Sequence, residues 1–535
     1  MNRSVSLLDS TLRDGAQARG ISFSVPDKLK IAKTLDDLGV GYIEAGNPGS
    51  NPKDLEFFKL VRETPLKHAK IAAFGSTRRR GADVESDKNV LSVLAADAPV
   101  VCIVGKSWDF HARAVLGAGL DENLRMIEET VAFFKRKGKE VIFDAEHFFD
   151  GYKSDPAYAM KTLDAAALAG ADILCLCDTN GGAFPADIEA VTAAAFNVYG
   201  KNIGVHCHDD CGMAVANTVV AIGAGASHAQ GTINGFGERC GNACLSTVIP
   251  NLQLKQHIQC IPDANMAALT TVARLVAEIA NDHVSGRAPY VGGSAFAHKG
   301  GMHADGVAKA AGSYEHIDPE RVGNKREILT SEVAGKAAVL LKIGEMGLSA
   351  PGGAFKAERI TEKLKELEHQ GYQYEAAEGS FSLVVRKQLG RHRPFFELKS
   401  YRVLGEQPYE DGKSASALIK VVVDGKTEIT AAEGDGPVNA LDKALRKALG
   451  VFYPSLSEVY LTDYKVRVLD GKSATASKVR VLIESTDGAD IWTTVGVSRD
   501  IIEASWFALL DSIEYKLFKD NGRPENDAAA PAGKR

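Results

Sequence analysis

Two histidines, His206 and His208, lie two positions apart in the segment GVHCHDDCGMAVANT at residues 204–218. Side chains at this spacing on a strand point to the same face, so the two imidazoles would project together. Two imidazoles on one face are half of a divalent-metal site. The alternative to metal binding is a pair of histidines that have only a polar or core role. Metal chemistry therefore requires an oxygen ligand from elsewhere in the chain.

Asp14, in the segment DSTLRDGAQ at residues 9–17, is the oxygen ligand that the sequence offers. One carboxylate and two imidazoles leave open positions on a metal, as in catalytic rather than structural sites. The adjacent Arg13 can meet a carboxylate through two hydrogen bonds, while the alternative is an Arg–Asp pair in a surface turn before Gly15. With the histidine pair in the same chain, we favour Asp14 as a ligand.

Eight short apolar runs alternate with amphipathic stretches along the first part of the chain. Three of these stretches, at 27–39, 120–138 and 155–170, have helical spacing and end in glycine. Strand and helix alternating eight times over about 250 residues predict a (β/α)8 TIM barrel, which we place at residues 1–275. The predicted strands are 5–11, 41–46, 70–75, 100–105, 140–148, 171–179, 202–210 and 228–235.

A doubly wound open sheet would show the same alternation, but TLRDGAQARG after the first strand lacks its GxGxxG fingerprint. In a barrel, the active site gathers at the carboxyl ends of the strands. Asp14 follows the first predicted strand, and His206 and His208 end the seventh. The barrel would therefore bring these three side chains together.

Other polar residues occupy the same ends of predicted strands. Asp144 and Glu146 share a face of the fifth strand, so one could act on a substrate while the other anchors a loop. After the eighth strand, the glycines of GFGERCGNA (235–243) allow close backbone approach, and Asn242 there could reach the metal. The arginine run 78–80, after the third strand, is either solvated or a contact for a phosphate-bearing substrate.

After about residue 275 the rhythm of strand and helix ends. Residues 276–388 are first rich in glycine and histidine and then helical, which predicts a mostly helical linker region. Residues 389–520 alternate at period two around helical stretches at 438–450 and 501–518, which predicts a separate α+β domain. The tail 521–535 is predicted to be disordered.

Composition and charge limit the classes of partner. The 535 residues carry a formal net charge of −6, which gives no general attraction to nucleic acid or anionic membranes. The sequence shows no signal-peptide pattern and no stretch of membrane-spanning length, so we expect a cytoplasmic protein that acts on a small molecule. The eight cysteines lack CxxC spacing and are expected to be buried free thiols.

Four motifs occur in order along the chain: DSTLRDGAQ, HCHDDCGMAVANT, GTINGFGERCGNA and AFAHKGGMHADG. Together they closely resemble the acyl-CoA Claisen condensing family of metal-dependent barrels, which includes isopropylmalate, homocitrate and citramalate synthases. The resemblance extends to about residue 520, and FGSTRRRG and GKSWDFH look most like the branch that joins acetyl-CoA to pyruvate. Ala16 departs from the more common DGEQ form of the first motif, and leaves Arg13, Asp14 and Gln17 intact.

The resemblance implies a divalent metal, zinc ahead of magnesium or manganese, held by Asp14, His206 and His208, with Asn242 as a nearby or weak ligand. The metal would chelate the 2-oxo acid and make its carbonyl more electrophilic. Glu146 would be the base that takes a proton from the methyl group of the co-substrate acetyl-CoA.

The resemblance also implies partners and further site residues. A partner subunit would deliver the catalytic His303, which makes the protein at least a homodimer. Arg78 and Arg79 would contact the phosphates of CoA. The C-terminal domain would be regulatory, and for the pyruvate branch the implied inhibitor is isoleucine. Arg13 is implied to be catalytic as well, and the implied substrate-binding residues are Arg13, Gln17, Thr179 and Tyr314.

Other activities stay open at this point. The same site with another 2-oxo acid would make isopropylmalate or homocitrate. Lys106, His111 or His147 could line the pocket that selects the 2-oxo acid. An acyl-CoA lyase shares the metal motif but lacks a long C-terminal domain. Metal hydrolases of the amidohydrolase type place HxH after the first strand rather than the seventh, and a non-catalytic metabolite sensor would be expected to have lost a ligand.

Overall fold

The computed structural model describes residues 3–298, 301–328, 343, 353–374, 377–405, 414–469, 477–488 and 490–520. The predicted disordered tail and most of residues 329–352 in the predicted linker lie outside the described residues. Contacts divide the chain into two compact units. The first unit is formed by residues 1–296 and 316–326, and the second by residues 297–315 and 327–535.

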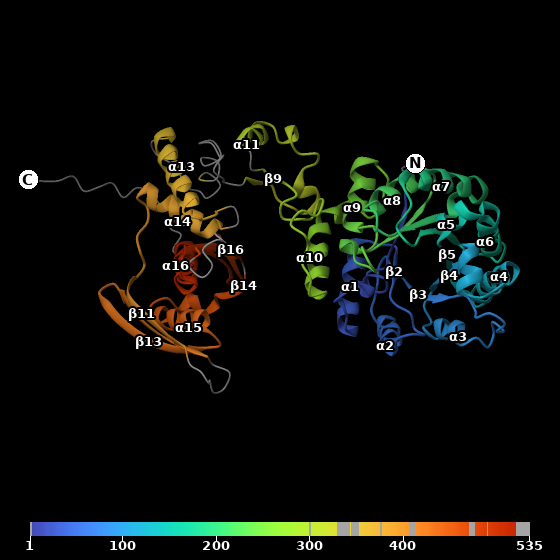
Figure 1. Cartoon of the computed structure of the whole chain (residues 1–535), viewed down its shortest axis with the longest axis horizontal. Helices are drawn as coiled ribbons and strands as arrows, with labels where there is room; N and C mark the ends of the chain where they lie inside the picture. The colour runs from blue at the N-terminus through green and yellow to red at the C-terminus, as the bar shows by residue number, and fades with distance from the viewer. Residues whose placement is uncertain are drawn as a thin grey trace, which may run out of the picture. The chain divides into compact units, whose positions relative to one another are not determined.

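Eight parallel strands, β1 to β8, close into a barrel in the order of the sequence (Figure 1). β1 pairs with both β2 and β8, which closes the ring. The predicted TIM barrel is thus confirmed, and the open sheet is wrong. The strands are β1 Ser6–Asp9, β2 Tyr42–Glu44, β3 Lys70–Ser76, β4 Val100–Lys106, β5 Glu140–Glu146, β6 Ile173–Asp178, β7 Ile203–Cys207 and β8 His228–Gly231.

Helices cover the outside of the barrel, as Figure 1 shows. The first begins with a capping box, in which Ser24 and Asp27 each accept the other's backbone N–H, and ends at Gly39 in a left-handed conformation. None of the helices in the described parts of the chain is long and apolar enough to cross a membrane. The helices of this unit are α1 Val25–Leu38, α2 Pro52–Val61, α3 Lys88–Ala95, α4 Leu120–Arg136, α5 Phe148–Ser154, α6 Pro156–Leu168, α7 Pro185–Tyr199, α8 Ala214–Gly223, α9 Leu245–Pro250 and α10 Leu269–Ile279.

An apolar layer fills the inside of the barrel. Because side chains alternate along a strand, a residue two positions nearer the carboxyl end faces the same interior. Polar side chains follow the apolar layer in this way and line the mouth of the barrel. The buried apolar layer contains Leu8, Ala72, Val100, Cys102, Ile142, Cys175 and Cys177. The polar residues that follow it on β2, β5, β7 and β8 are Glu44, Asp144, His206 and Gln230.

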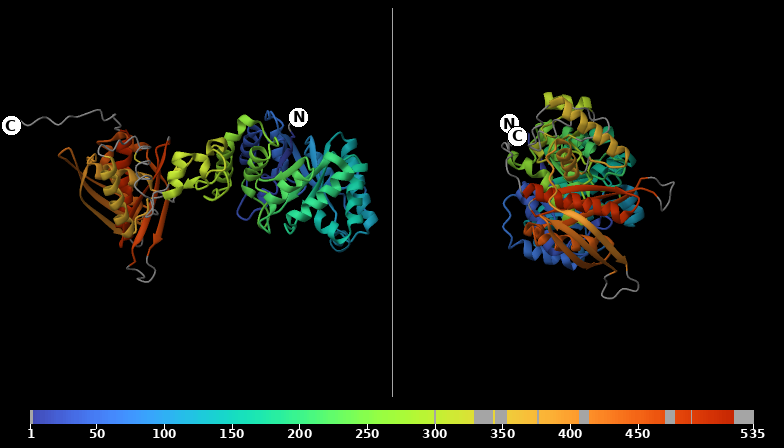
Figure 2. Two further views of the ribbon diagram at one scale, coloured as in Figure 1. Left: turned by 90° about the horizontal axis from the view of Figure 1, so that it is seen from above. Right: turned by 90° about the vertical axis from the view of Figure 1, so that its left-hand side faces the viewer.

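The second unit contains two three-stranded antiparallel sheets, which confirms an α+β domain in the C-terminal part of the chain. Its elements are β9 Ala297–His298, α11 Gly301–Lys309, β10 Glu327–Ile328, α13 Gly353–His369, α14 Glu378–Leu389, β11 Glu397–Gly405, β12 Ala415–Val423, β13 Lys426–Gly434, α15 Pro437–Gly450, β14 Tyr460–Val468, β15 Val479–Thr486, β16 Ile491–Ser498 and α16 Ile501–Asp520. α15 packs on β12 and β13, and α16 packs on β15 and β16 (Figures 1 and 2).

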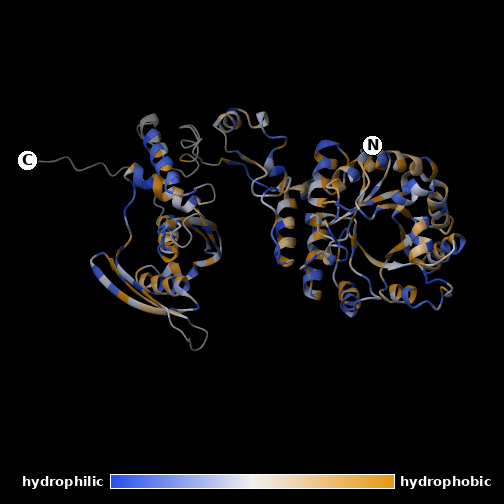
Figure 3. Cartoon of the chain, in the orientation of Figure 1, coloured by the Kyte–Doolittle hydropathy of each residue, from blue (hydrophilic) through white to orange (hydrophobic). Residues whose placement is uncertain are grey.

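Apolar and polar residues alternate along the strands of these sheets, as Figure 3 shows and as expected when a helix covers one face. Polar residues interrupt the alternation in β13 and a glycine interrupts it in β16, so the pattern of residues 389–520 does not by itself define these two strands. Helix α14 packs on β16 in a second apolar cluster, where Phe381 and Val385 contact Val495 and Val497. The end of the predicted linker region is therefore packed on the domain that follows it.

All eight cysteines are free. Cys102, Cys175 and Cys177 are buried inside the barrel, as expected for thiols in a core. Cys211 and Cys240 are exposed, so the expectation of burial was wrong for these two. Both lie in loops that follow β7 and β8, where the chain turns over the mouth of the barrel.

Candidate active site

The three residues predicted to hold a metal lie together at the carboxyl end of the barrel strands. Nε2 of His206 is 3.4 Å from Nε2 of His208, and Oδ2 of Asp14 is 4.0 and 3.9 Å from these two atoms. All three side chains are buried, and each offers a ligand atom within 4.8 Å of the others. The donor set of two nitrogens and one oxygen converges on a single point, as in catalytic metal sites.

Burial controls the protonation of this group. It lowers the pKa of His206, and it lowers the pKa of His208 to about 4, so both rings are neutral at neutral pH. Burial also raises the pKa of Asp14, but the adjacent guanidinium of Arg13, first among the groups that oppose it, helps to hold that pKa below its ordinary value. Neutral imidazoles and an ionised carboxylate are the forms that bind a metal. The residues present therefore fit a divalent cation.

Asn242 reaches this group through Asp14. Its Nδ2 donates to Oδ1 of Asp14 at 2.9 Å and to the carbonyl of Phe236 at 3.1 Å, while its Oδ1 is buried without a partner among the described residues. The predicted close approach of glycine is seen at Gly237, where a Cβ would lie 2.2 Å from Nδ2 of Asn242. Any larger residue at 237 would displace the amide from Asp14.

Arg13 is held rigidly beside the candidate ligands. Its Nε donates to Oε2 of Glu44 at 2.7 Å, its Nη1 donates to Oδ2 of Asp14 at 2.9 Å, and its Cζ lies 4.1 Å from the centre of the Phe74 ring. Ser10 donates to the same oxygen of Glu44. The sequence analysis missed Glu44, although it lies near the end of the second predicted strand (41–46), where the period-two rule could have found it.

Two further polar residues of the barrel interior connect to the histidine pair. Nδ1 of His206 lies 2.9 Å from Oε1 of Gln230, whose Nε2 donates to Oδ1 of Asp144 at 2.9 Å. Burial and the charge of Glu44 raise the pKa of Asp144 to about 7. Asp144 thus lies on the inner face, as predicted. Gln230 was missed, because HAQG was interpreted only as part of a strand.

Glu146 and Thr179 both lie at the mouth, at the ends of β5 and β6. Oε2 of Glu146 forms an ion pair with Nζ of Lys106. The hydroxyl of Thr179 accepts from the backbone N–H of His147 at 2.8 Å. The rings of His147 and His111 lie 4.3 Å apart and border the same end of β4 and β5.

Gln17 lies beside Arg13 in an open cavity of about 260 Å³, lined also by Phe74 and Asn47. The side chain of Gln17 is exposed, so it is free to meet a ligand that enters there. Arg13 lines this cavity and also donates to Asp14, so the cavity lies next to a neighbour of the candidate ligand. A small organic acid is of the right size for it.

Two arginines of the run after β3, which were predicted to contact CoA phosphates, bind carboxylates of the protein. Arg78 is buried, and its guanidinium donates to Glu129 at 2.5 Å and to Glu122 at 2.8 Å. Two carboxylates from α4 therefore neutralise it, which argues against a phosphate contact for Arg78. Arg79 pairs with Asp87 at 2.9 Å but is about half exposed, so its predicted contact stays a prediction.

His303 and Tyr314 belong to the second unit. The exposed ring of His303 stacks on Tyr314, with centres 4.2 Å apart and planes 25° from parallel. The two residues predicted to reach the site from the linker are thus neighbours of each other. Their contact with substrate stays a prediction.

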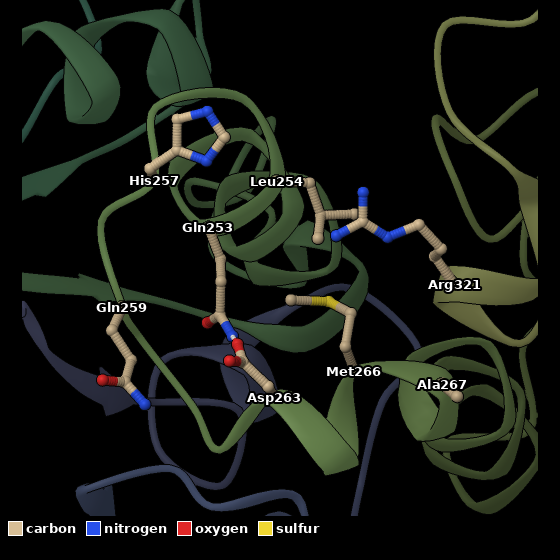
Figure 4. Close-up of a pocket in the computed structure, with 8 residues that line it drawn as sticks. All are labelled: Gln253, Leu254, His257, Gln259, Asp263, Met266, Ala267 and Arg321. Atoms are coloured by element: carbon tan, nitrogen blue, oxygen red, sulfur yellow. Dashed lines mark hydrogen bonds between the residues drawn. The ribbon is translucent and has the colours of Figure 1, made fainter. Parts of the chain in front are cut away.

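A cavity of about 500 Å³ lies at the other end of the barrel (Figure 4). Gln259 lines it, and the backbone of Gln259 pairs with Ser4 and Val5, which precede β1. Asp14 follows β1, so this cavity is separate from the candidate metal site. Figure 4 also shows Gln253, which donates to Asp263 across the floor of the cavity.

Three families match successive parts of the chain. HMGL-like matches residues 4–276, Homocitrate synthase post-HMGL domain-like matches 290–372, and LeuA allosteric (dimerisation) domain matches 375–517. The first of these covers the barrel with all of its candidate ligands.

Relatives match over nearly the full length. The (R)-citramalate synthase of Aquifex aeolicus is 51% identical over 522 residues, which cover 97% of this chain and 99% of the relative. Those of Geobacter sulfurreducens and Synechocystis sp. are 50% and 49% identical; each covers 96% of this chain, and 98% and 96% of the relatives. Among solved structures, the HMG-CoA lyase of Bacillus subtilis is 20% identical, with a TM-score of 0.46 over 53% of this chain and 95% of its own. The chain therefore belongs to the HMGL-like family, in the group formed by the (R)-citramalate synthases.

Proposed function

We propose that this protein condenses acetyl-CoA with pyruvate and water to give (R)-citramalate and CoA. It would be an acyltransferase of isoleucine biosynthesis in the cytoplasm. The observation that carries the chemistry is the convergence of Asp14, His206 and His208 beside Arg13. Relatives that are about half identical over their full length bear the name of this activity.

Asp14, His206 and His208 would hold the metal. Zinc is the first choice because two neutral imidazoles and a carboxylate match its preferred ligands, and magnesium and manganese are the alternatives. When bound, the metal supplies Lewis-acid chemistry to the keto and carboxylate groups of pyruvate. Asn242 orients Asp14 by its hydrogen bond to Oδ1.

Arg13, Thr179 and Gln17 would bind pyruvate. Glu44 and Asp14 engage Nε and Nη1 of Arg13, which leaves its outer edge for the substrate carboxylate. Thr179 accepts a backbone hydrogen bond and can donate its own O–H to the same carboxylate. These contacts would orient the keto carbon for attack.

Glu146 would take a proton from the methyl group of acetyl-CoA, and the resulting carbanion would form the new bond to the keto carbon of pyruvate. Lys106 forms an ion pair with Glu146 and would orient its carboxylate. His303 and Tyr314 would complete the site from a partner subunit. Water would then cleave the thioester, which releases the CoA thiol and makes the sequence irreversible.

The mouth of the barrel favours pyruvate over 2-oxoglutarate. A second substrate carboxylate needs a cation inside the pocket. Lys106 is the cation at the ends of β4 and β5, and Glu146 already neutralises it. A methyl group requires no such partner.

The activity is tested by release of free CoA thiol from acetyl-CoA with pyruvate, 2-oxoisovalerate, 2-oxobutyrate or 2-oxoglutarate, with and without prior chelation. We expect chelator-sensitive release that is strongest with pyruvate. Strongest release with another acid would support the condensation reaction but reject pyruvate as the substrate. Release with none of the acids would reject the proposed function.

The C-terminal unit would make the homodimer and bind isoleucine, in keeping with the LeuA allosteric (dimerisation) domain that matches residues 375–517. We expect isoleucine to slow release of CoA thiol, with leucine as the control amino acid. Light scattering at increasing protein concentration tests the dimer. Equal inhibition by leucine and isoleucine would reject the assignment of the inhibitor.

A further inference from the structure

A buried chain of hydrogen bonds leads from the barrel interior to the candidate ligand His206. Nδ1 of His206 lies 2.9 Å from Oε1 of Gln230, and Nε2 of Gln230 donates to Oδ1 of Asp144 at 2.9 Å. His206 and Gln230 are register partners on the adjacent strands β7 and β8. The three side chains belong to residues that are 6%, 1% and 4% exposed, so water does not compete for these bonds.

The direction of the chain follows from what each group can donate. A carboxyl oxygen that carries no proton can only accept, so Oδ1 of Asp144 takes an amide N–H of Gln230, and this turns the amide oxygen toward His206. That oxygen can accept only from a protonated Nδ1, which leaves Nε2 of His206 unprotonated. Nε2 is the atom that faces His208 and Asp14.

We infer that Gln230, oriented by Asp144, is a positioning residue that holds His206 in the tautomer able to bind a metal. The inference rests on the proposed metal site. With the amide reversed, Gln230 would donate to Nδ1, the ring proton would move to Nε2, and His206 would point an N–H at the metal position.

Packing alone does not require a glutamine at this position. A methionine has similar length and would fill the space without burying an amide, whose desolvation is costly. The two imidazoles also differ, since Nδ1 of His208 is buried without a partner among the described residues. Only His206 has its outer nitrogen engaged by a side chain, so the loss of Gln230 acts on that ligand.

The test measures zinc affinity of the full-length protein at pH 8 by competition with a chromophoric chelator. Gln230→Met removes the acceptor, and we expect zinc affinity to fall about 10- to 100-fold. Asp144→Asn keeps the shape but no longer dictates which end of the amide faces His206, so a smaller loss is expected. Asp9→Asn is the matched control, because Asp9 is a buried carboxylate bonded to Thr11 and Ile233 and is expected to keep wild-type affinity.

Wild-type zinc affinity in the Gln230→Met protein would overturn the inference. An equal loss in all three variants would also overturn it, since that pattern marks general damage to the barrel. The thermal midpoint of the zinc-free proteins shows which variants are folded, and if Gln230→Met does not fold, unchanged affinity in Asp144→Asn overturns the inference. A wild-type protein that binds no zinc would instead contradict the proposed metal site.

Discussion

Lys106 and Glu146 form an ion pair between the last residues of β4 and β5, which are register partners. The two side chains are 22% and 21% exposed, so the pair borders the mouth of the barrel and not bulk solvent. A second pair of the same type, Lys70 with Glu140, joins the first residues of β3 and β5. The barrel thus contains a matched control for the pair at its mouth.

Lys106→Met is expected to lower kcat by about 10- to 100-fold, because Glu146 loses the cation that orients it. Lys106→Arg should recover most of the rate. Lys70→Met serves as the control, and an equal loss there would assign Lys106 a structural role only.

Arg13→Lys should lower kcat/KM for pyruvate by about 100-fold, because lysine cannot bind Glu44, Asp14 and a substrate carboxylate in one planar arrangement. Zinc affinity should change by less than about fivefold, since the ligands stay in place. Steady-state kinetics and chelator competition separate the two effects. Arg62→Lys, at an exposed pair with Asp97, is the control. A variant that loses zinc and activity together would mean that Arg13 acts through Asp14.

His208→Ala should lower zinc affinity by about 100-fold or more and abolish release of CoA thiol. Removal of the metal from the wild-type protein by a chelator should have the same effect, and added zinc should restore activity only in the wild type. His257→Ala changes an exposed histidine at the other end of the barrel and should behave as wild type. Full activity in the presence of the chelator would contradict a metal-dependent mechanism.

Asp511→Asn should stabilise the C-terminal unit at high pH. Burial raises the pKa of Asp511 to about 6, and its Oδ2 accepts from Ser380 at 2.6 Å. The folded carboxyl therefore binds its proton more tightly than the unfolded one. The stability that this bound proton gives to the folded unit is fully present below about pH 4 and is lost as the pH rises through 6. The gain in the free energy of unfolding for the variant should be near zero at pH 4 and of the order of 2 kcal/mol at pH 8.

Denaturant unfolding of the Asp511→Asn protein can be followed by the emission of Trp492 and Trp506, which are both buried in this unit. A Trp108→Phe background removes the tryptophan of the barrel. Glu458→Gln, at an exposed position of the same unit, is the control and should show no dependence on pH. A constant difference between pH 4 and pH 8 would mean that Asp511 has the same pKa in the folded and the unfolded chain, which would contradict the raised value.

The barrel and the ligand set could be predicted because both depend on local patterns. Alternation of strand and helix defines the fold, and the end of a strand in a barrel defines where Asp14, His206 and His208 must lie. The second unit was predicted less completely. A strand such as β13 forms because it pairs with β12, and its own polar residues do not show the alternation that predicts a strand.

The missed contacts connect residues that are far apart in the sequence. Gln230 donates to Asp144, 86 positions away, and no local spacing encodes that bond. The same holds for Arg78, since the two glutamates that neutralise it lie on a helix 44 and 51 positions later. A run of arginines alone cannot tell which guanidinium is paired and which is free.

The polar residues of the barrel mouth come from several different strands. The metal ligands lie on β7 and after β1, whereas Lys106 and Glu146 end β4 and β5 on another part of the ring. We therefore expect a replacement at position 106 to change the surroundings of Glu146 and to leave the metal ligands in place. Such a scaffold can acquire a new substrate through single mutations, each of which gives a folded and metal-loaded intermediate on which natural selection can act.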